Sequence, residues 1–256
     1  MDAIHRRGLD IAALNCSGNQ LDPSDEGKAH KIGVEKTFKL AEQLGVKKIV
    51  MMSGCPSAGP LEVVPNWITH CFFPSHQAIL EWQWNEVAFP YWEQTVRLAK
   101  DYGIEQIAIE NLGNNLVYNP ETLFTLRNQV GDMVGMNLDP SHLFWMGADP
   151  ISSARALGDA IYHVHGKDVR LERGIHQVNG LLDHKPMEEF ADRSWNYVAV
   201  GYGHDLSYWK EFFTVVRMTG YDGPVCLEME DLTMDPLTGV AKSVQVLKEA
   251  LPKRFA

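Results

Sequence analysis

The chain has 256 residues, of which 45% are hydrophobic and 22% charged, a composition typical of globular proteins and unlike that of disordered or fibrous ones. Its formal net charge of -10 argues against nucleic acid as a partner, because an acidic surface repels phosphates. The four cysteines form no CxxC pair, so we expect neither a zinc knuckle nor a disulfide framework. No run reaches the roughly 18 apolar residues of a membrane span, so we expect no membrane anchor and a cytoplasmic location.

Short apolar runs alternate with helical segments along the chain, a pattern that predicts parallel strands joined by crossover helices. Two segments carry apolar residues at helical spacing and should pack on the core with them, Val34, Phe38, Ala41 and Leu44 in one and Val240, Val244, Leu247 and Leu251 in the other. Further helices are expected over residues 82–102, 120–129, 150–157 and 205–219, with Pro120 and Pro150 in a first helical turn and Asp205 as an N-cap. We predict seven strands, over residues 11–15, 48–53, 106–110, 134–139, 161–165, 195–200 and 225–229.

Seven strands approach the eight of a closed parallel barrel. The chain opens on residues 3–7, which resemble the end of a helix stopped by Gly8, so we expect either that a strand and most of a helix are missing before them or that the barrel is closed by other means. We therefore predict an α/β fold, a (β/α)8 TIM barrel that lacks its first strand and most of its first helix, as one domain over residues 1–256. An open doubly wound sheet is the alternative that the same alternation permits.

Acidic and imidazole side chains stand at the carboxyl ends of several predicted strands, where ligands bind in parallel α/β folds. Several buried carboxylates in one strand-end mouth would repel one another unless a cation neutralised them. The sequence thus predicts a divalent metal, for which such oxygen-rich ligands suit Mn²⁺ best, with Co²⁺, Mg²⁺ or Zn²⁺ as alternatives. Alternate strand residues share a face, so spacing alone does not choose between His163 and His165 or between Glu228 and Glu230. The strand-end residues are Glu110, Asp139, His142, His165, Lys167, Asp168, Glu228, Glu230 and Asp231.

The series Glu110, Asp139-Pro-Ser-His142, His163-Val-His165 and Glu228 resembles the xylose-isomerase-like TIM-barrel superfamily, in the branch of sugar phosphate isomerases and epimerases. The resemblance covers the chain from Leu9 onward. Compared with ketose 3-epimerases, it implies that Glu110, Asp139, His165 and Glu228 bind one divalent ion. It also implies that the two glutamates exchange protons with the substrate, and that His142 contacts the substrate.

Two positions depart from that pattern. The epimerases carry a substrate-contacting Glu six residues after the first ligand, where this chain has Leu116, and an Arg six residues after the metal histidine, where it has Leu171. These differences put the epimerisation of free ketoses in doubt and leave the metal ligands untouched.

Other residues are candidates for substrate binding. Lys167 and Asp168 follow the metal histidine, with a solvent-facing ion pair as the plain alternative. Asn19 follows the first strand and could equally form a turn. Trp67 lies in the long segment 53–84, which either closes over a sugar or meets a second subunit. A second long segment, residues 169–194, replaces an expected helix.

The leading prediction is a metal-dependent isomerase or epimerase of a keto-sugar or sugar phosphate, working through an enediolate with Glu110 and Glu228 as acid and base. The alternative is a dehydratase or lyase on an oxidised sugar, as in the inosose dehydratases that resemble the same superfamily. An endonuclease-IV-like hydrolase fits less well, because three zinc ions need more histidines than the strand ends supply. A barrel subunit without activity is the remaining reading.

Overall fold

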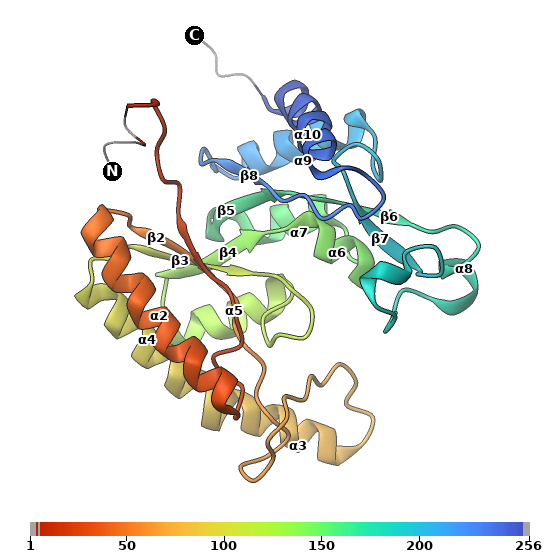
Figure 1. Cartoon of the computed structure of the whole chain (residues 1–256). Helices are drawn as coiled ribbons and strands as arrows, with labels where there is room; N and C mark the ends of the chain where they lie inside the picture. The colour runs from red at the N-terminus through yellow and green to blue at the C-terminus, as the bar shows by residue number, and fades with distance from the viewer. Residues whose placement is uncertain (1–3, 5, 253–256) are drawn as a thin grey trace. The chain divides into compact units, whose positions relative to one another are not determined.

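A computed structural model describes Ile4 and residues 6–252, and the chain divides into two compact units, Met1–Asn137 and Leu138–Ala256 (Figure 1). The helix end expected at residues 3–7 lies partly outside the described residues. Among the residues described, none of the helices combines the length and the apolar character needed to traverse a bilayer.

The first unit holds four strands that pair in chain order, all parallel: β1 (Leu14–Cys16), β2 (Lys48–Met51), β3 (Gln106–Glu110) and β4 (Val134–Leu138). These are the first four predicted strands. The apolar side chains of β2, β3 and β4 are buried on both faces, as in a sheet covered by helices, whereas the residues of β1 are half-buried or exposed. Glu110 is the last residue of β3, so the strand delivers a carboxylate at its carboxyl end.

Three helices make the crossovers that parallel strands require: α2 (Asp25–Leu44), α4 (Phe89–Asp101) and α5 (Pro120–Val130). Ser24 caps α2 by accepting a hydrogen bond from the Glu26 amide, and Gly45 ends it at a positive φ of 70°. Asn119 and Thr122 form a capping box at the start of α5, with Pro120 in its first turn as predicted. In Figure 1, α2 and α4 run alongside these strands, with α4 beside α5.

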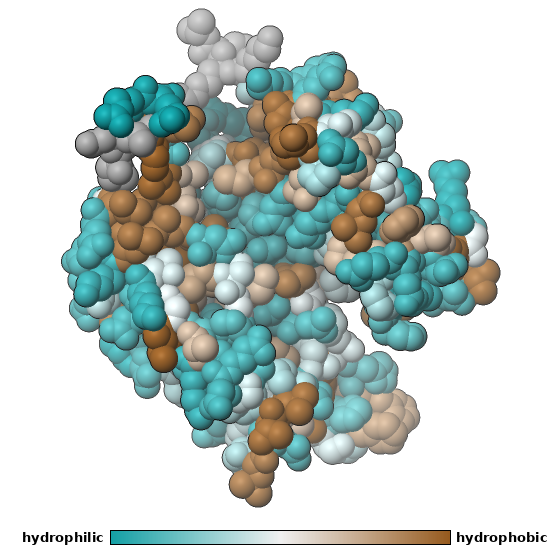
Figure 2. Space-filling model, in the orientation of Figure 1, coloured by the Kyte–Doolittle hydropathy of each residue, from teal (hydrophilic) through white to brown (hydrophobic). Residues whose placement is uncertain are grey.

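The helix predicted over residues 82–102 begins earlier and is interrupted. It consists of α3 (Pro74–Trp82), a π-helical stretch (Gln83–Ala88) and α4. The Gln83 amide is buried at this irregular turn and donates hydrogen bonds to the carbonyls of Pro56, Ser57 and Asn66, which ties the preceding long segment to the helix. Brown side chains project around α3 in Figure 2. The exposed apolar residues of this segment are Leu61, Val63, Val64, Phe72 and Phe73.

In the second unit, β5 (Ile161–Gly166) pairs in parallel with β8 (Val225–Leu227), and His165 lies opposite Cys226. Helix α9 (Leu206–Met218) contacts both α7 (Pro150–Leu157) and α10 (Pro236–Ala250). Asp205 caps α9 by accepting from the Tyr208 amide, and Pro150 opens α7, as the sequence predicted.

The strand predicted over residues 195–200 is β7 (Trp195–Val198), and it is not one of the parallel set. It pairs antiparallel with β6 (Asp168–Leu171), which was expected to be irregular. Polar Asp168 and Arg170 alternate with apolar Val169 and Leu171, which is the period of a strand, but Asp168 and Val169 are both buried. The long segment between these strands is mostly irregular. It contains the one-turn helix α8 (His176–Asn179) and the short 3₁₀ helix Met187–Glu189.

The buried face of α10 was predicted only in part: Leu247 is buried as expected, but Val240 is not. Val240 is 39% exposed, and the buried residues are Gly239, Ser243, Leu247 and Ala250. Two small residues pack closely on this face: a Cβ at position 239 would lie 1.9 Å from the Met229 Cε, at the end of a flexible side chain, and the Ser243 hydroxyl accepts a hydrogen bond from the Val200 amide.

Candidate metal centre

Asp139 is the N-cap of α6 (Pro140–Met146), and its side chain is completely buried. The Oδ1 atom accepts a hydrogen bond of 2.8 Å from the Ser141 amide. That bond fixes the carboxylate and turns Oδ2 toward His165, whose Nδ1 lies 3.2 Å away. The proline at the first helical position forces α6 to begin at this point, so the strand-end carboxylate doubles as a helix cap.

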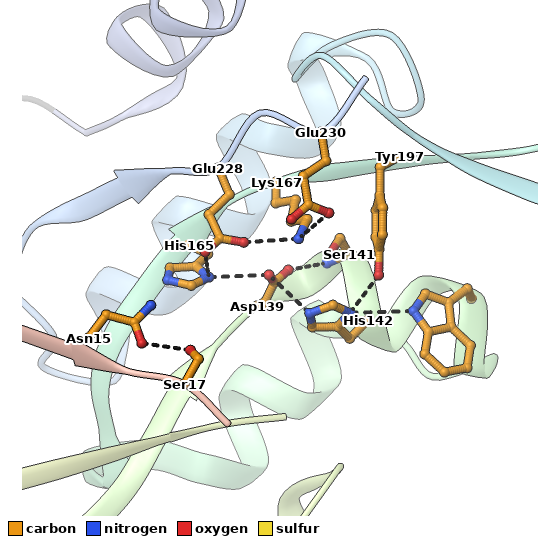
Figure 3. Close-up of polar contacts among 11 residues, drawn as sticks. Asn15, Ser17, Asp139, Ser141, His142, His165, Lys167, Tyr197, Glu228 and Glu230 are labelled. Atoms are coloured by element: carbon orange, nitrogen blue, oxygen red, sulfur yellow. Dashed lines mark hydrogen bonds and ion pairs between the residues drawn. The ribbon is translucent and has the colours of Figure 1, made fainter. Parts of the chain in front are cut away.

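His165 and Glu228 complete a three-residue cluster in this unit. His165 is at the end of β5 and Glu228 directly follows β8, and the pairing of those strands brings their side chains together. The His165 Nδ1 lies 3.6 Å from Glu228 Oε1, and one ligand atom from each of Asp139, His165 and Glu228 lies within 4.8 Å of the other two. Figure 3 shows these side chains pointing toward one another.

The chemistry and spacing of this cluster fit a divalent ion. Ligands about 2.1 Å from a metal such as Mg²⁺ and at right angles to one another lie about 3 Å apart. The distances of 3.2 and 3.6 Å from His165 Nδ1 to the two carboxylates are close to that value. Two carboxylates and an imidazole also form the mixed oxygen and nitrogen set that Mn²⁺, Fe²⁺, Co²⁺ and Zn²⁺ accept.

Lys167 is the cation that accompanies this cluster. Its ammonium donates to Glu228 Oε2 at 2.9 Å, lies 2.9 Å from Glu230 Oε2, and sits 4.4 Å from the centre of the Tyr197 ring. Burial by itself would lower the pKa of Lys167, but the negative charges of Asp139 and Glu228 outweigh burial and raise it above its ordinary range. The lysine is therefore held charged. Glu230 contacts Lys167, whereas Glu228 contacts Lys167 through one oxygen and faces His165 with the other.

The Asp139 carboxylate is likewise held ionised. Burial would raise its pKa, but the neighbouring imidazoles of His142 and His165 and the ammonium of Lys167 outweigh burial and bring the pKa well below its usual value. Asp139, Glu228 and Glu230 bring three negative charges against the one positive charge of Lys167. A dication would bring these carboxylates and the lysine close to neutrality.

His142 lies beside Asp139 on α6, and two of its partners were not found from the sequence. Its Nε2 is 3.4 Å from Asp139 Oδ2. Its Nδ1 faces the Tyr197 hydroxyl at 3.0 Å and the Trp145 indole N–H at 3.4 Å (Figure 3). No local pattern relates Tyr197 to His142, because the two residues are 55 positions apart.

The Asp168 carboxylate is occupied by the loop that follows β7. Its Oδ2 accepts from the backbone amides of Gly201, Gly203 and His204 at 3.0, 3.0 and 3.1 Å, and its Oδ1 lies 2.8 Å from the His204 ring. Gly203 is required here, because a Cβ would lie 2.1 Å from the Val169 carbonyl oxygen. This carboxylate therefore anchors a loop, and its predicted contact with substrate stays a prediction.

The remaining predicted site residues belong to the first unit. Glu110 is buried at the end of β3. The Asn19 amide group bonds to the backbone of Cys55 and Leu21 and so braces two loops. Trp67 packs edge-on against Tyr118 with ring centres 5.4 Å apart, and its buried indole N–H has no hydrogen-bond partner among the described residues. The roles of these three residues stay predictions.

Comparison with known sequences gives a family and a relative. The family model described as "Xylose isomerase-like TIM barrel" matches residues 2–250. An uncharacterised protein of Bacillus subtilis (strain 168), YfiH, is 58% identical over 251 residues, which are 97% of this chain and 80% of that protein.

Solved structures with the same fold include three relevant proteins, all with low sequence identity. The probable 3-DHS dehydratase AsbF of Bacillus anthracis has a TM-score of 0.65 and 16% identity, over 96% of this chain and 79% of that one. The IolI protein with a bound zinc atom has a TM-score of 0.63 and 19% identity, over 100% and 82%. The 3-keto-D-glucoside 4-epimerase YcjR of E. coli has a TM-score of 0.61 and 15% identity, over 96% and 82%.

Proposed function

Because the chain belongs to the xylose isomerase-like TIM barrel family, we propose that it is a divalent-metal-dependent isomerase or epimerase of a keto-sugar or sugar phosphate. The observation that carries the proposal is the cluster of Asp139, His165 and Glu228, whose ligand atoms lie within 4.8 Å of one another beside the buried Lys167. We propose Glu110 as the fourth ligand and Mn²⁺ as the ion. A cytoplasmic location is part of the same proposal.

When bound, the ion would polarise the oxygen of a substrate carbonyl and make the neighbouring C–H acidic. The chain's own residues then move the proton. The Glu228 carboxylate is held in one orientation by Lys167 at Oε2, which leaves Oε1 toward the ligand cluster. We propose that Glu110 takes the proton from one face of the carbon and that Glu228 returns one to the other face, which inverts the centre. Return of the proton to the neighbouring carbon would give an isomer.

A dehydratase or lyase is the second candidate. Removal of the same proton expels a hydroxyl or an alkoxide when one stands on the next carbon. The ammonium of Lys167, buried and held charged next to Glu228, is a hydrogen-bond donor for such a leaving oxygen. The likeness in fold to the probable dehydratase AsbF also favours this candidate.

Deuterium exchange tests the proposal. Manganese-loaded protein would be incubated in D₂O with a panel of ketoses, inososes and 3-keto-glucosides and followed by ¹H NMR. We expect loss of one substrate C–H signal with at least one member of the panel. A new stereocentre or a shifted carbonyl indicates an epimerase or isomerase, and loss of water or an aglycone indicates a lyase.

A matched pair of variants distinguishes the roles of Glu228 and Glu230, the two glutamates that contact Lys167. Glu228→Gln should abolish exchange, whereas Glu230→Gln should retain it, because only Glu228 also faces His165. Metal-loaded wild-type protein that exchanges no C–H and releases nothing from the whole panel would contradict the proposed function.

A further inference from the structure

Two hydrogen-bond donors converge on one ring nitrogen of His142. The Trp145 Nε1–H lies 3.4 Å from His142 Nδ1, and the Tyr197 hydroxyl lies 3.0 Å from the same atom. An indole N–H can only donate, so His142 Nδ1 must accept and cannot carry a proton. The ring proton is therefore on Nε2, which faces Asp139 Oδ2 at 3.4 Å.

The two donors are held on separate elements of the same unit. The Trp145 ring stacks on Trp195, with centroids 5.1 Å apart and an angle of 7° between the rings, and the Trp195 indole N–H donates to the Leu181 carbonyl at 3.0 Å. Tyr197 is buried on β7 opposite Val169, and Lys167 covers its ring. Neither donor can leave Nδ1 without disturbing the packing of β7.

We propose that Tyr197 and Trp145 are positioning residues that hold His142 in its Nε2–H tautomer, so that His142 donates to Asp139 Oδ2 and orients this carboxylate. The proposal rests on the proposed function only where it treats Asp139 as a metal ligand. The proposed role of His142 is to orient Asp139, which is a different role from the substrate contact that the family resemblance implies. It also makes the long segment before β7 part of the support of the centre, through Leu181 and Trp195.

The tautomer can be read directly in metal-free protein. In ¹⁵N-labelled protein, long-range ¹H–¹⁵N correlation distinguishes a protonated from an unprotonated imidazole nitrogen, and His142→Gln assigns the ring by loss of its signals. We expect wild-type His142 to show a protonated Nε2 and an unprotonated Nδ1. The double variant Tyr197→Phe with Trp145→Phe should populate the Nδ1–H tautomer, whereas the control Tyr202→Phe, an exposed tyrosine on the loop after β7, should not.

Mn²⁺ titration supplies a second readout. Loss of the group that orients a ligand typically weakens metal binding about 10- to 100-fold, which we expect for His142→Gln. If the double variant does not fold, Trp145→Phe alone should still shift the tautomer partially. Wild-type His142 with a protonated Nδ1, or folded variants with an unchanged tautomer, would overturn the proposal. Failure of wild-type protein to bind any ion would sink the proposed function and leave the tautomer result readable.

Discussion

The ammonium of Lys167 lies 2.9 Å from Glu228 Oε2, and the same ammonium lies 2.9 Å from Glu230 Oε2. Glu228 thus has one oxygen on a buried cation, while its other oxygen faces His165. This division of one carboxylate between a cation and the ligand cluster favours binding of an ion through Oε1 alone. It also makes Lys167 a residue on which both stability and metal affinity depend.

Lys167→Met should separate these two effects. The change leaves two carboxylates without their cation, but the Glu228 and Glu230 side chains are 29% and 46% exposed, so water replaces part of the lost interaction. We expect the free energy of unfolding of metal-free protein to fall by about 1–3 kcal/mol, less than for a fully buried pair. Mn²⁺ should bind several-fold more tightly, because a competing positive charge has gone.

Urea denaturation and calorimetric titration would measure the two quantities. Lys210→Met is the control, since Lys210 forms an exposed pair with Glu249 at 3.1 Å and its loss should change neither quantity by much. Weaker Mn²⁺ binding by Lys167→Met would contradict the assigned charge balance.

Asp139→Asn should remove metal binding while helix α6 keeps its N-cap. Asparagine caps helices as well as aspartate does, so α6 keeps its N-cap, but the neutral amide is a poor ligand for a dication. We expect Mn²⁺ affinity to fall by more than the roughly 100-fold that loss of a supporting residue can cause. The melting temperature of metal-free protein should also fall, because the lowered pKa of Asp139 means that its ionised carboxylate stabilises the fold. Asp149→Asn is the matched control, because Asp149 is the exposed N-cap of α7. Equal affinities in the two variants would refute the assignment.

Asp183 should make the long segment before β7 sensitive to acid. Burial would raise its pKa, but hydrogen bonds from the Lys185 and Ser194 amides and the charge of Lys185 outweigh burial and lower it. A folded-state pKa below the unfolded value of about 3.9 contributes stability that is present above pH 4 and is lost as the pH falls further. Thermal melting should show wild type more stable than Asp183→Asn at pH 5–8, with the gap closing below pH 4.

Asp192→Asn provides the comparison for that experiment, since Asp192 is exposed in the same segment. It should melt like wild type at every pH. If the difference in melting temperature between wild type and Asp183→Asn stayed constant down to pH 3, these contacts would not be lowering the pKa of Asp183.

Gly203→Ala should detach the loop that Asp168 anchors. The added methyl would lie 2.1 Å from the Val169 carbonyl oxygen, so backbone must move and the bonds of Asp168 to the loop must lengthen. We expect a loss of about 1–3 kcal/mol in the free energy of unfolding. Gly33→Ala in α2, where no atom lies within 4 Å of the new methyl, should instead gain up to about 1 kcal/mol. Equal effects at the two glycines would contradict this account of Gly203.

Periodicity and strand-end residue types predicted much of the fold. The TIM-barrel class is confirmed by the family match. The first four parallel strands, the first-turn prolines Pro120 and Pro150 and the N-cap Asp205 lie where they were expected. The β6 strand was missed because its alternation covers only four residues inside a segment that looked like a loop. The buried face of α10 was placed too far toward Val240, because valines outweigh Gly239 and Ser243 in hydropathy although these small residues are the buried ones beside Leu247.

The part of the candidate site that depends on residue types at strand ends could be predicted from the sequence. Strand-end position indicated Asp139, one of His163 and His165, and one of Glu228 and Glu230, and the family resemblance implied His165 and Glu228. The pairing of β5 with β8 brings these two together. Spacing could not choose between Glu228 and Glu230, because both lie on one face; the choice depends on which carboxylate turns toward His165. The contacts of Tyr197 and the loop-anchoring role of Asp168 depend on tertiary packing, for which the sequence carries no periodic signal.

Anomalous X-ray diffraction from a crystal grown with Mn²⁺ tests the central claim most directly. The account predicts one strong peak per chain, with His165 Nδ1, Asp139 Oδ2 and Glu228 Oε1 about 2.0–2.4 Å from it and Glu110 as the fourth protein ligand. No peak, or a peak bound by other residues, would contradict the account.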